Sequence, residues 1–335
     1  MTAVPATITD GRALVDRAMR AAADRLDPLT RRVVAYHLGW TDADGRPAEA
    51  GGKALRPALA LLSARAAGTP DETALPGAVA VEFVHAFSLL HDDLMDGDRT
   101  RRHRPAAWTV FGPSAAILGG DALLALAENL LLDEHTRGAH WAARALTAAT
   151  QRLISGQALD IGFEERDDVS LDECLAMAAD KTGALLACAC SIGAMLGEGP
   201  APLVTALTGF GSEMGLAFQL VDDLLGIWGS PGTTGKPVLA DLRTRKKSLP
   251  VVFALTAGTA ASGRLAELYA HPEPSEESLR EMARLVEEAG GRDWAAAEAD
   301  RRIASAERHL AGSGIPGHVA AEFGAIARFV TSRDH

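Results

Sequence analysis

A chain of 335 residues with 47% hydrophobic residues can bury a large core, as one large domain or two ordinary ones. Its 44 acidic residues outnumber its 33 basic ones, which argues against a general nucleic-acid binder. The three cysteines, Cys174, Cys188 and Cys190, match neither a disulfide framework nor a paired zinc motif, so we expect small buried side chains in a reducing cytoplasm.

The N-terminal residues contain no long apolar run, so no signal peptide is expected. No stretch of about 18 residues is both uncharged and strongly hydrophobic, so we expect no transmembrane helix and no integral membrane association. Helical periodicity recurs along the chain, and runs of alternating β-branched residues do not. It predicts helices near 10–38, 54–67, 73–97, 113–134, 138–164, 170–196, 201–229, 240–259, 262–270, 275–290, 293–311 and 316–332.

The breaks between these helices are too short for a domain linker, and no fixed-period repeat is present. We therefore expect a single all-α domain over residues 1–335. Residues 113–131 and 183–197 are apolar on nearly every side of the helix, which is typical of a bundle interior or a subunit interface.

The first polar motif is GGKALRP (51–57), at the start of the helix near 54–67. Lys53 and Arg56 are three residues apart and share one helix face. Because a helix N-terminus favours negative charge, this motif predicts an anion site.

The predicted helix at 73–97 ends in HDDLMD, and its remaining residues are largely apolar. Asp92, Asp93 and Asp96 project from one helical turn, where like charges repel. Most acidic runs are solvated helix ends, but the apolar approach indicates an interior helix. Carboxylates at such an end favour a cavity that holds a hard cation, and Mg²⁺ with a phosphate completing its shell fits best.

Four arginines follow these acids, and their forked side chains match phosphate oxygens. They are Arg99, Arg101, Arg102 and Arg104. Acids beside arginines are the layout of a diphosphate–magnesium site, and direct arginine–aspartate ion pairs are the alternative.

A second motif, FQLVDDLLG (218–226), repeats the doubled acid as Asp222 and Asp223. Gly226 stands at the position that matches Asp96, so this motif has two carboxylates instead of three. Further bases occur in DKTGALL, TGKP and RKKSLP: Lys181, Lys236 and Lys246. Pro237 after Lys236 breaks the P-loop pattern, so a nucleotide site is disfavoured.

In this order and spacing, GGKALRP, VHAFSLLHDDLMD with RR, GQALD, KTGAL, FQLVDDLLG, GKP and KKSLP resemble a trans-type isoprenyl diphosphate synthase. The resemblance spans roughly residues 45–260. It implies an all-α bundle of the isoprenoid synthase type with a deep central cavity, usually a homodimer. It also implies the head-to-tail joining of isopentenyl diphosphate to an allylic diphosphate.

The resemblance also implies the roles of individual residues. Three Mg²⁺ ions would be bound by Asp92, Asp96 and Asp222, with Asp93 and Asp223 in support. The allylic diphosphate would be held by Arg101, Lys181, Lys236 and Lys246. Isopentenyl diphosphate would be held by Lys53, Arg56, His85 and Arg102, and the reacting carbons would lie along Thr182 and Gln219.

Some residues have two interpretations. His91, Gln157 and Asp160 fit a second layer of support around the metals, although a lone buried histidine is usually a core residue and Gln157 with Asp160 also fits a surface pair. Where the family commonly has glycine after the arginine pair, this chain has His103.

Product length is predicted from the turn before Asp92. Small Ser88 leaves room and bulky Phe87 would form a floor, which favours a C20 product, geranylgeranyl diphosphate, with C15 or C25 next. Two alternatives to a synthase are a terpene cyclase on the same fold and a non-catalytic partner subunit. The second anion pocket argues against the cyclase, and the intact first acidic motif argues against the partner subunit.

Overall fold

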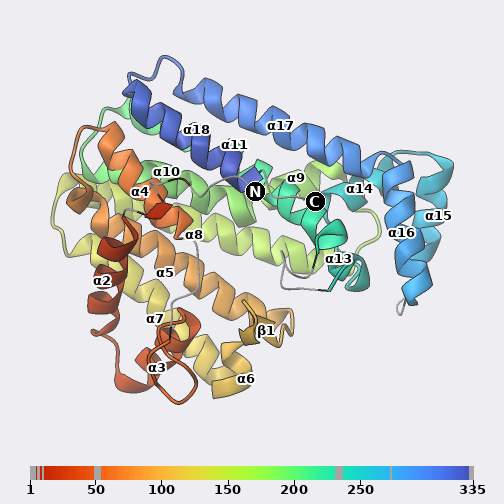
Figure 1. The fold of residues 1–335 in the computed structure, drawn as a ribbon, viewed down its shortest axis with the longest axis horizontal. Helices are drawn as coiled ribbons and strands as arrows, with labels where there is room; N and C mark the ends of the chain where they lie inside the picture. The colour runs from red at the N-terminus through yellow and green to blue at the C-terminus, as the bar shows by residue number, and fades with distance from the viewer. Residues whose placement is uncertain are drawn as a thin grey trace.

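The structure is a computed structural model that describes residues 5, 8–9, 11–48, 54–230, 237–271 and 274–331. Its regular structure is almost entirely helical (Figure 1). The helices are α2 (Arg12–Ala23), α3 (Pro28–His37), α4 (Leu55–Ala66), α5 (Asp71–Met95), α6 (Ala107–Phe111), α7 (Pro113–Leu132), α8 (Arg137–Glu164), α9 (Leu171–Ala178), α10 (Ala184–Leu196), α11 (Ala201–Trp228), α13 (Ala240–Arg243), α14 (Leu249–Thr256), α15 (Ala260–Tyr269), α16 (Glu276–Glu288), α17 (Gly291–Leu310) and α18 (Gly317–Thr331). The expected all-α fold is confirmed.

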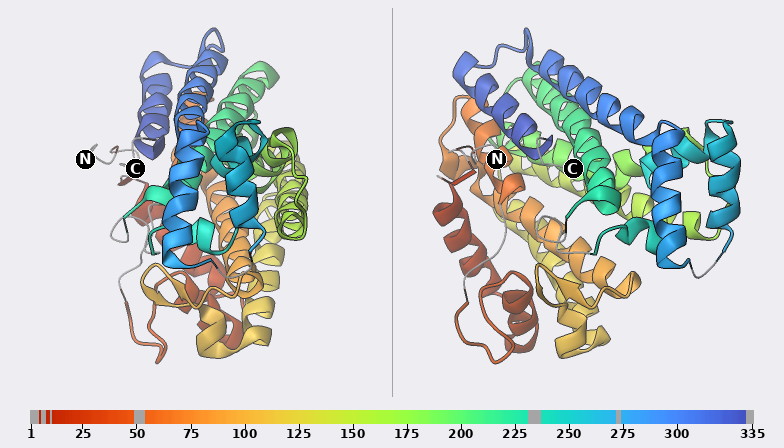
Figure 2. Two further views of the ribbon diagram at one scale, coloured as in Figure 1. Left: turned by 90° about the vertical axis from the view of Figure 1, so that its right-hand side faces the viewer. Right: turned by 45° about the vertical axis from the view of Figure 1, so that its right-hand side comes forward.

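The centre of the bundle is built from the most apolar helices. Helix α5 packs against α4, α7 and α10, and α11 packs against α10 and α17. Every residue of α10 is buried. Figures 1 and 2 show α17 and α18 lying along the outside of this core, while α14, α15 and α16 gather at one end. The long helices α5 and α11 therefore bring the two acidic motifs to the same region of the molecule.

Two of the predicted helices are each divided in the structure. The segment predicted at 10–38 contains α2 and α3, because the Asp27 side chain accepts hydrogen bonds from the backbone N–H groups of Leu29 and Thr30 and Pro28 starts the new helix. The segment predicted at 240–259 contains α13 and α14, and the connection between them carries Lys246. A five-residue π-helical turn, η1 (Ala179–Gly183), interrupts the predicted helix 170–196 without ending it.

A two-stranded hairpin, β1 (Thr100–Arg101) and β2 (Arg104–Pro105), was not predicted. Arg102 and His103 form its turn, and their φ angles are +50° and +62°. The hairpin turns the chain back immediately after the first acidic motif, and Nε of Arg101 donates a hydrogen bond to Asp93.

Three helical segments are long and apolar enough to cross a membrane by length and composition alone, contrary to the sequence-based expectation. They are Asp71–Met95, Pro113–Leu132 and Leu171–Leu196. In the first and third, 67% of the most apolar window is buried, against 39% in the second. The first and third are thus explained by burial in the core, whereas α7 keeps an exposed apolar face.

Candidate active site

A cavity of about 510 Å³ lies between the ends of α5 and α11, a size typical of a small-molecule site. Most of the residues singled out in the sequence line it: Arg56, His85, Ser88, Asp92, Asp96, Arg101, Arg102, Lys181, Thr182, Gln219, Asp222 and Lys246. Asp93, Asp223 and Phe87 are not in its lining. Lys53 and Lys236 lie outside the described residues.

The two adjacent aspartates at the end of α5 have different surroundings. Asp92 lines the cavity, whereas Asp93 is 1% exposed and accepts a 2.6 Å hydrogen bond from Nε of Arg101. The ion pair between an arginine and an aspartate, the alternative interpretation of this segment, is thus realised for Asp93. It holds the guanidinium of Arg101 at the cavity wall.

The doubled acid of α11 is divided in the same way. Asp222 lines the cavity, and Asp223 is 3% exposed. Asp223 accepts hydrogen bonds from Nε2 of Gln219 at 2.8 Å and from the backbone N–H of Leu249 at 2.9 Å. Because Leu249 is the first residue of α14, Asp223 anchors the start of that helix.

Burial changes the ionisation of these acids. It raises the pKa of Asp92 to about 6; the nearby Lys181 opposes the rise, and Asp96 adds to it. Burial likewise raises the pKa of Asp223 to about 6, opposed by Lys246. A cation in the cavity would favour the charged form of Asp92, so metal binding and ionisation are coupled there.

The basic wall of the cavity is held by acids outside it. Lys181 projects from the π-helical turn and forms an ion pair with Asp160. A Cβ on Gly156 would lie 2.3 Å from the backbone nitrogen of Lys181, so only glycine allows α8 and this turn to approach so closely. In this structure Asp160 therefore forms an ion pair with Lys181. π-Helical turns occur frequently at functional sites.

Lys246 reaches the cavity from the connection between α13 and α14. Burial alone would lower its pKa, but the carboxylates of Asp241, Asp223, Asp160 and Asp222 raise that pKa overall. Its ammonium lies 3.7 Å from Oδ1 of Asp223. Lys246 is therefore fully charged and faces the same space as the acids.

A second basic group lies on the other side of the cavity. Arg56 from the first turn of α4, His85 from α5 and Arg102 from the hairpin all line it. Burial lowers the pKa of His85 well below 6.5, and Arg56 and Arg102 lower it further, so the imidazole is neutral. Nε of Arg56 is buried, and no hydrogen-bond partner for it is found among the described residues. This group suits a second anion.

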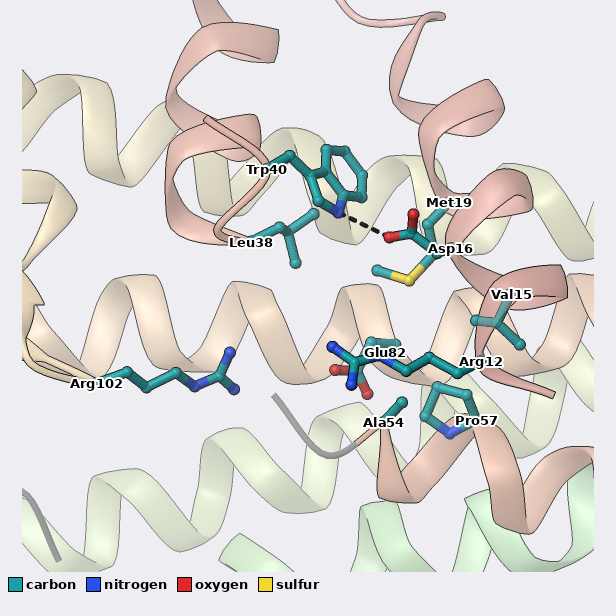
Figure 3. Close-up of a pocket in the computed structure, with 10 residues that line it drawn as sticks. All are labelled: Arg12, Val15, Asp16, Met19, Leu38, Trp40, Ala54, Pro57, Glu82 and Arg102. Carbon is teal, nitrogen blue, oxygen red and sulfur yellow. Dashed lines mark hydrogen bonds between the residues drawn. The ribbon is translucent and has the colours of Figure 1, made fainter. Parts of the chain in front are cut away.

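Glu82 lies among these basic residues, and the sequence analysis did not identify it as a site residue. Figure 3 shows Arg102 and Arg12 reaching toward Glu82 from opposite sides, in a small cavity next to the large one. Burial raises the pKa of Glu82, and Arg56 and Arg102 oppose the rise. In the sequence, Glu82 is a single acid within the apolar run VEFVH. That pattern does not reveal the basic residues beside it, so it predicts no role for Glu82.

Thr182 and Gln219 are joined across two helices. The Thr182 hydroxyl donates to Oε1 of Gln219 at 2.6 Å, and Gln219 in turn donates to Asp223. The buried carboxylate therefore fixes the orientation of both side chains at the cavity wall.

An apolar layer lies one helical turn away from the polar one. Ser88 precedes Asp92, Leu153 precedes Gln157 and Phe218 precedes Asp222, each by four residues, and Leu185 follows Lys181 by four. The ring of Phe87 instead packs edge-on against His91, with ring centroids 4.8 Å apart. The expected floor residue thus stands behind the cavity wall, next to Ser88.

The residues facing the cavity fit a hard divalent cation in their chemistry, since Asp92, Asp96 and Asp222 offer only carboxylate oxygens. Among the described residues, no three His, Cys, Asp or Glu side chains already converge on one metal position. Both polar atoms of the Gln157 amide are buried and have no hydrogen-bond partner within the described segments, and Gln157 is 7% exposed at the cavity. These features suit a cation whose coordination is completed by a bound ligand.

Comparison with known proteins agrees with this geometry. The sequence model of a family described as polyprenyl synthetase matches residues 46–286. The chain is 50% identical over 325 residues to a (2E,6E)-farnesyl diphosphate synthase of Mycobacterium tuberculosis, covering 96% of this chain and 90% of that protein.

Two further proteins are similar over nearly the whole chain. A geranylgeranyl diphosphate synthase of Mycobacterium tuberculosis is 45% identical over 316 residues, covering 90% of this chain and 89% of that protein. The crystal structure of a polyprenyl synthetase from Streptomyces coelicolor superposes with a TM-score of 0.93 at 54% identity, covering 97% of this chain and 98% of that one.

Proposed function

The chain belongs to the polyprenyl synthetase family and is an isoprenyl diphosphate synthase, and from this premise we propose that it joins isopentenyl diphosphate head-to-tail to allylic diphosphates. The observation that carries the proposal is the single cavity with carboxylates on one wall, two separate basic groups, and an apolar layer one turn away. Such a cavity suits two diphosphates, a cation set and a prenyl chain.

The allylic diphosphate is assigned to Arg101, Lys181 and Lys246, together with Lys236, beside Asp92, Asp96 and Asp222. Breaking the allylic C–O bond places negative charge on the leaving diphosphate, and these bases stabilise that charge. Bound Mg²⁺ would supply further electrostatic stabilisation of the leaving group. The apolar layer excludes water from the carbocation, and the released diphosphate takes the final proton.

Isopentenyl diphosphate is assigned to Arg56, His85 and Arg102, together with Lys53. The buried Nε of Arg56, which has no hydrogen-bond partner in the part of the chain that the structure describes, supports this assignment. Thr182 and Gln219 are assigned to the wall beside the reacting carbons. Asp93 and Asp223 act by orienting Arg101 and Gln219 and do not face the cavity.

For the product we propose C20, geranylgeranyl diphosphate, on the ground that small Ser88 lines the apolar layer. A C15 product is the alternative, favoured by the 50% identity to a protein named as a farnesyl diphosphate synthase. The proposed location is the cytoplasm, in keeping with three free, buried cysteines.

We also propose that two copies associate through α7 and α8. Helix α7 exposes Ile117, Leu118 and Leu132 at 43%, 61% and 53%, and α8, which packs against it, exposes Trp141, Ile154, Leu159 and Ile161. On α7 the three exposed side chains lie on one face of the helix. An exposed apolar face is uncommon on a monomer.

One assay tests the reaction against its alternatives. Purified protein is incubated with Mg²⁺ and dimethylallyl or farnesyl diphosphate, with and without radiolabelled isopentenyl diphosphate, and products are separated by chain length. Elongated diphosphates support the proposal. Hydrocarbons formed without isopentenyl diphosphate would identify a cyclase, and no turnover would identify a partner subunit.

A further inference from the structure

A separate cavity of about 180 Å³ lies between the hairpin, the end of α3 and the start of α6, and we call it the hairpin cavity. Figure 1 shows these three elements together at the lower end of the view. No acid is found among the described residues that line it, and its charged or polar side chains are those of Tyr36, His37, Arg101, Arg102 and Arg104. The cavity has room for several water molecules or one small anion, and its lining is basic.

The hairpin cavity differs from the group of residues assigned to isopentenyl diphosphate. Arg56 and His85 line the large cavity and not the hairpin cavity. His37 and Arg104 line the hairpin cavity and not the large one. Arg102, like the arginine before it, lines both. The two cavities therefore share part of one wall and differ in their other basic residues.

The hairpin brings like charges together. Its register places Arg101 directly opposite Arg104, and like charges in such a pair destabilise a sheet. Arg102, in the turn between them, has a φ of +50°, which is unfavourable for a residue other than glycine. Asp93 pairs with Arg101, and a bound anion would likewise offset the charge of the other two arginines.

Arg104 is held in place by uncharged groups. Its Nη2 donates to the carbonyl of Thr41 at 2.8 Å, and its guanidinium carbon lies 4.4 Å from the ring centroid of Tyr36. Burial and the three arginines of the hairpin lower the pKa of His37 to about 3, so its imidazole is neutral. A neutral imidazole donates one N–H, and the guanidinium keeps further N–H groups. Both side chains can therefore donate to an anion in this cavity.

We propose that the hairpin cavity is a second anion site, which binds a phosphate group of inorganic phosphate or diphosphate through His37, Arg102 and Arg104. Forked guanidinium groups match phosphate oxygens. The inference rests on the proposed function in one respect, since that reaction releases inorganic diphosphate. Because Arg102 lines both cavities, an anion bound here draws its guanidinium away from isopentenyl diphosphate and so competes with that substrate.

The first experiment measures binding of inorganic phosphate by calorimetry, with the whole chain, a chelator and constant ionic strength. Arg104→Met should weaken phosphate binding by about tenfold or more, because charge-assisted hydrogen bonds are lost. His37→Phe keeps a ring and removes the N–H, so it should weaken binding by about threefold or more. Thermal unfolding checks that both variants fold, and if Arg104→Met does not, His37→Phe decides.

Arg99→Gln is the matched control, because Arg99 lies just before the hairpin and lines neither cavity, so phosphate binding should be unchanged. Lys246→Met removes a base of the large cavity, and phosphate binding that depends on Arg104 should remain in it. Binding that is lost in Lys246→Met but intact in Arg104→Met and His37→Phe would confine anions to the large cavity and overturn the inference.

The second experiment measures inhibition of chain elongation. At a phosphate concentration equal to its dissociation constant, the apparent KM for isopentenyl diphosphate should double, while the KM for the allylic substrate stays unchanged. In Arg104→Met the same phosphate concentration should leave both constants unchanged. Equal inhibition of the native protein and Arg104→Met would overturn the inference and leave the proposed function intact.

Inorganic diphosphate in place of phosphate identifies the source of the anion. Tighter Arg104-dependent binding of diphosphate supports the released product as the ligand, and tighter binding of phosphate supports free phosphate. A chain that binds phosphate through Arg104 but does not elongate allylic diphosphates would keep this site and lose the proposed function.

Discussion

At the scale of single residues, the two doubled acids show what a motif does and does not specify. Local spacing alone does not distinguish the two aspartates of a pair, and only the family resemblance implied that Asp93 and Asp223 play supporting roles. In the structure Asp92 and Asp222 face the cavity, while Asp93 and Asp223 are buried and hold neighbouring groups. Helix geometry alone predicts that adjacent residues point about 100° apart, but which of the two faces the cavity depends on packing between distant helices.

Asp92 gives the first prediction. Asp92→Asn should lower turnover by about 10²–10³-fold, because a carboxylate facing the leaving group is lost. In the native protein, cation binding should weaken as pH falls through about 6, since protonated Asp92 no longer attracts the cation. Mn²⁺ titrations between pH 5 and 8 measure this, and the dependence on pH should flatten in the variant. Near-native turnover in Asp92→Asn would contradict the metal assignment.

The same raised pKa affects stability without cations. Folded Asp92 binds its proton more tightly than the unfolded chain does, so the folded state carries more protons between about pH 4 and 6 and loses stability as pH rises through that range. Asp92→Asn should therefore be more stable than the native protein at pH 7 and not at pH 4. Denaturant unfolding at both pH values, with a chelator present, checks the sign.

His103 gives the second prediction. It occupies the left-handed region at φ +62°, which costs a non-glycine residue about 1 kcal/mol. His103→Gly should raise the free energy of unfolding by roughly that amount and leave product length unchanged. His135→Gly, at φ +50° on an exposed turn far along the chain, is the matched comparison. A loss of stability in His103→Gly alone would mean that the imidazole makes a contact worth more than the strain.

At the scale of helices and strands, most elements were predictable because long apolar periods and strong caps specify them locally. One error is the break at Asp27 and Pro28 between α2 and α3. Three others fall in short segments that carry a basic residue of the cavity: the Thr244–Ser248 segment with Lys246, the hairpin with Arg102, and the π-helical turn with Lys181. In each of these three segments a basic side chain lines the cavity. Local sequence periodicity does not predict segments whose conformation depends on tertiary packing.

The last turns of α5 give the third prediction, on product length. Phe87 packs against His91, whose Nε2 lies 3.1 Å from the carbonyl oxygen of Ile117 on α7. Gly120 leaves room for that ring, since a Cβ there would lie 2.3 Å from Nε2. Phe87→Ala should open space behind Ser88 and lengthen the product by at least one five-carbon unit, measured as the distribution of products at fixed substrate ratio.

Ser88→Phe is the opposite test on the neighbouring residue, because it fills the apolar layer that Ser88 leaves open. It should shorten the product. If neither change alters the distribution, the chain does not run along this side of α5, and Phe218 and Leu185 would be the next positions to alter.

At the scale of the whole molecule, the sequence predicted which residues line the cavity better than it predicted which of them contact one another. Spacing and motif type indicated which residues meet in one cavity, but Glu82 and Asp241 were not identified. Each is a single acid in its local sequence. Its role depends on a neighbour from another part of the chain, Arg56 for Glu82 and, for Asp241, Gly226, which leaves room for its carboxylate. A single sequence holds no direct record of such long-range pairs.

Association of two copies gives the last prediction. Leu118 is 61% exposed on the apolar face of α7, so Leu118→Glu would bury a charge in the proposed interface at a cost of several kcal/mol. Sedimentation at micromolar concentration should show a dimer for the native protein and a monomer for Leu118→Glu. Leu29→Glu is the matched control, because Leu29 is 79% exposed and lies on α3 rather than on α7 or α8, so this change should leave the dimer intact. A native protein that sediments as a monomer would contradict the association of two copies. A dimer that survives Leu118→Glu would place the contact away from α7.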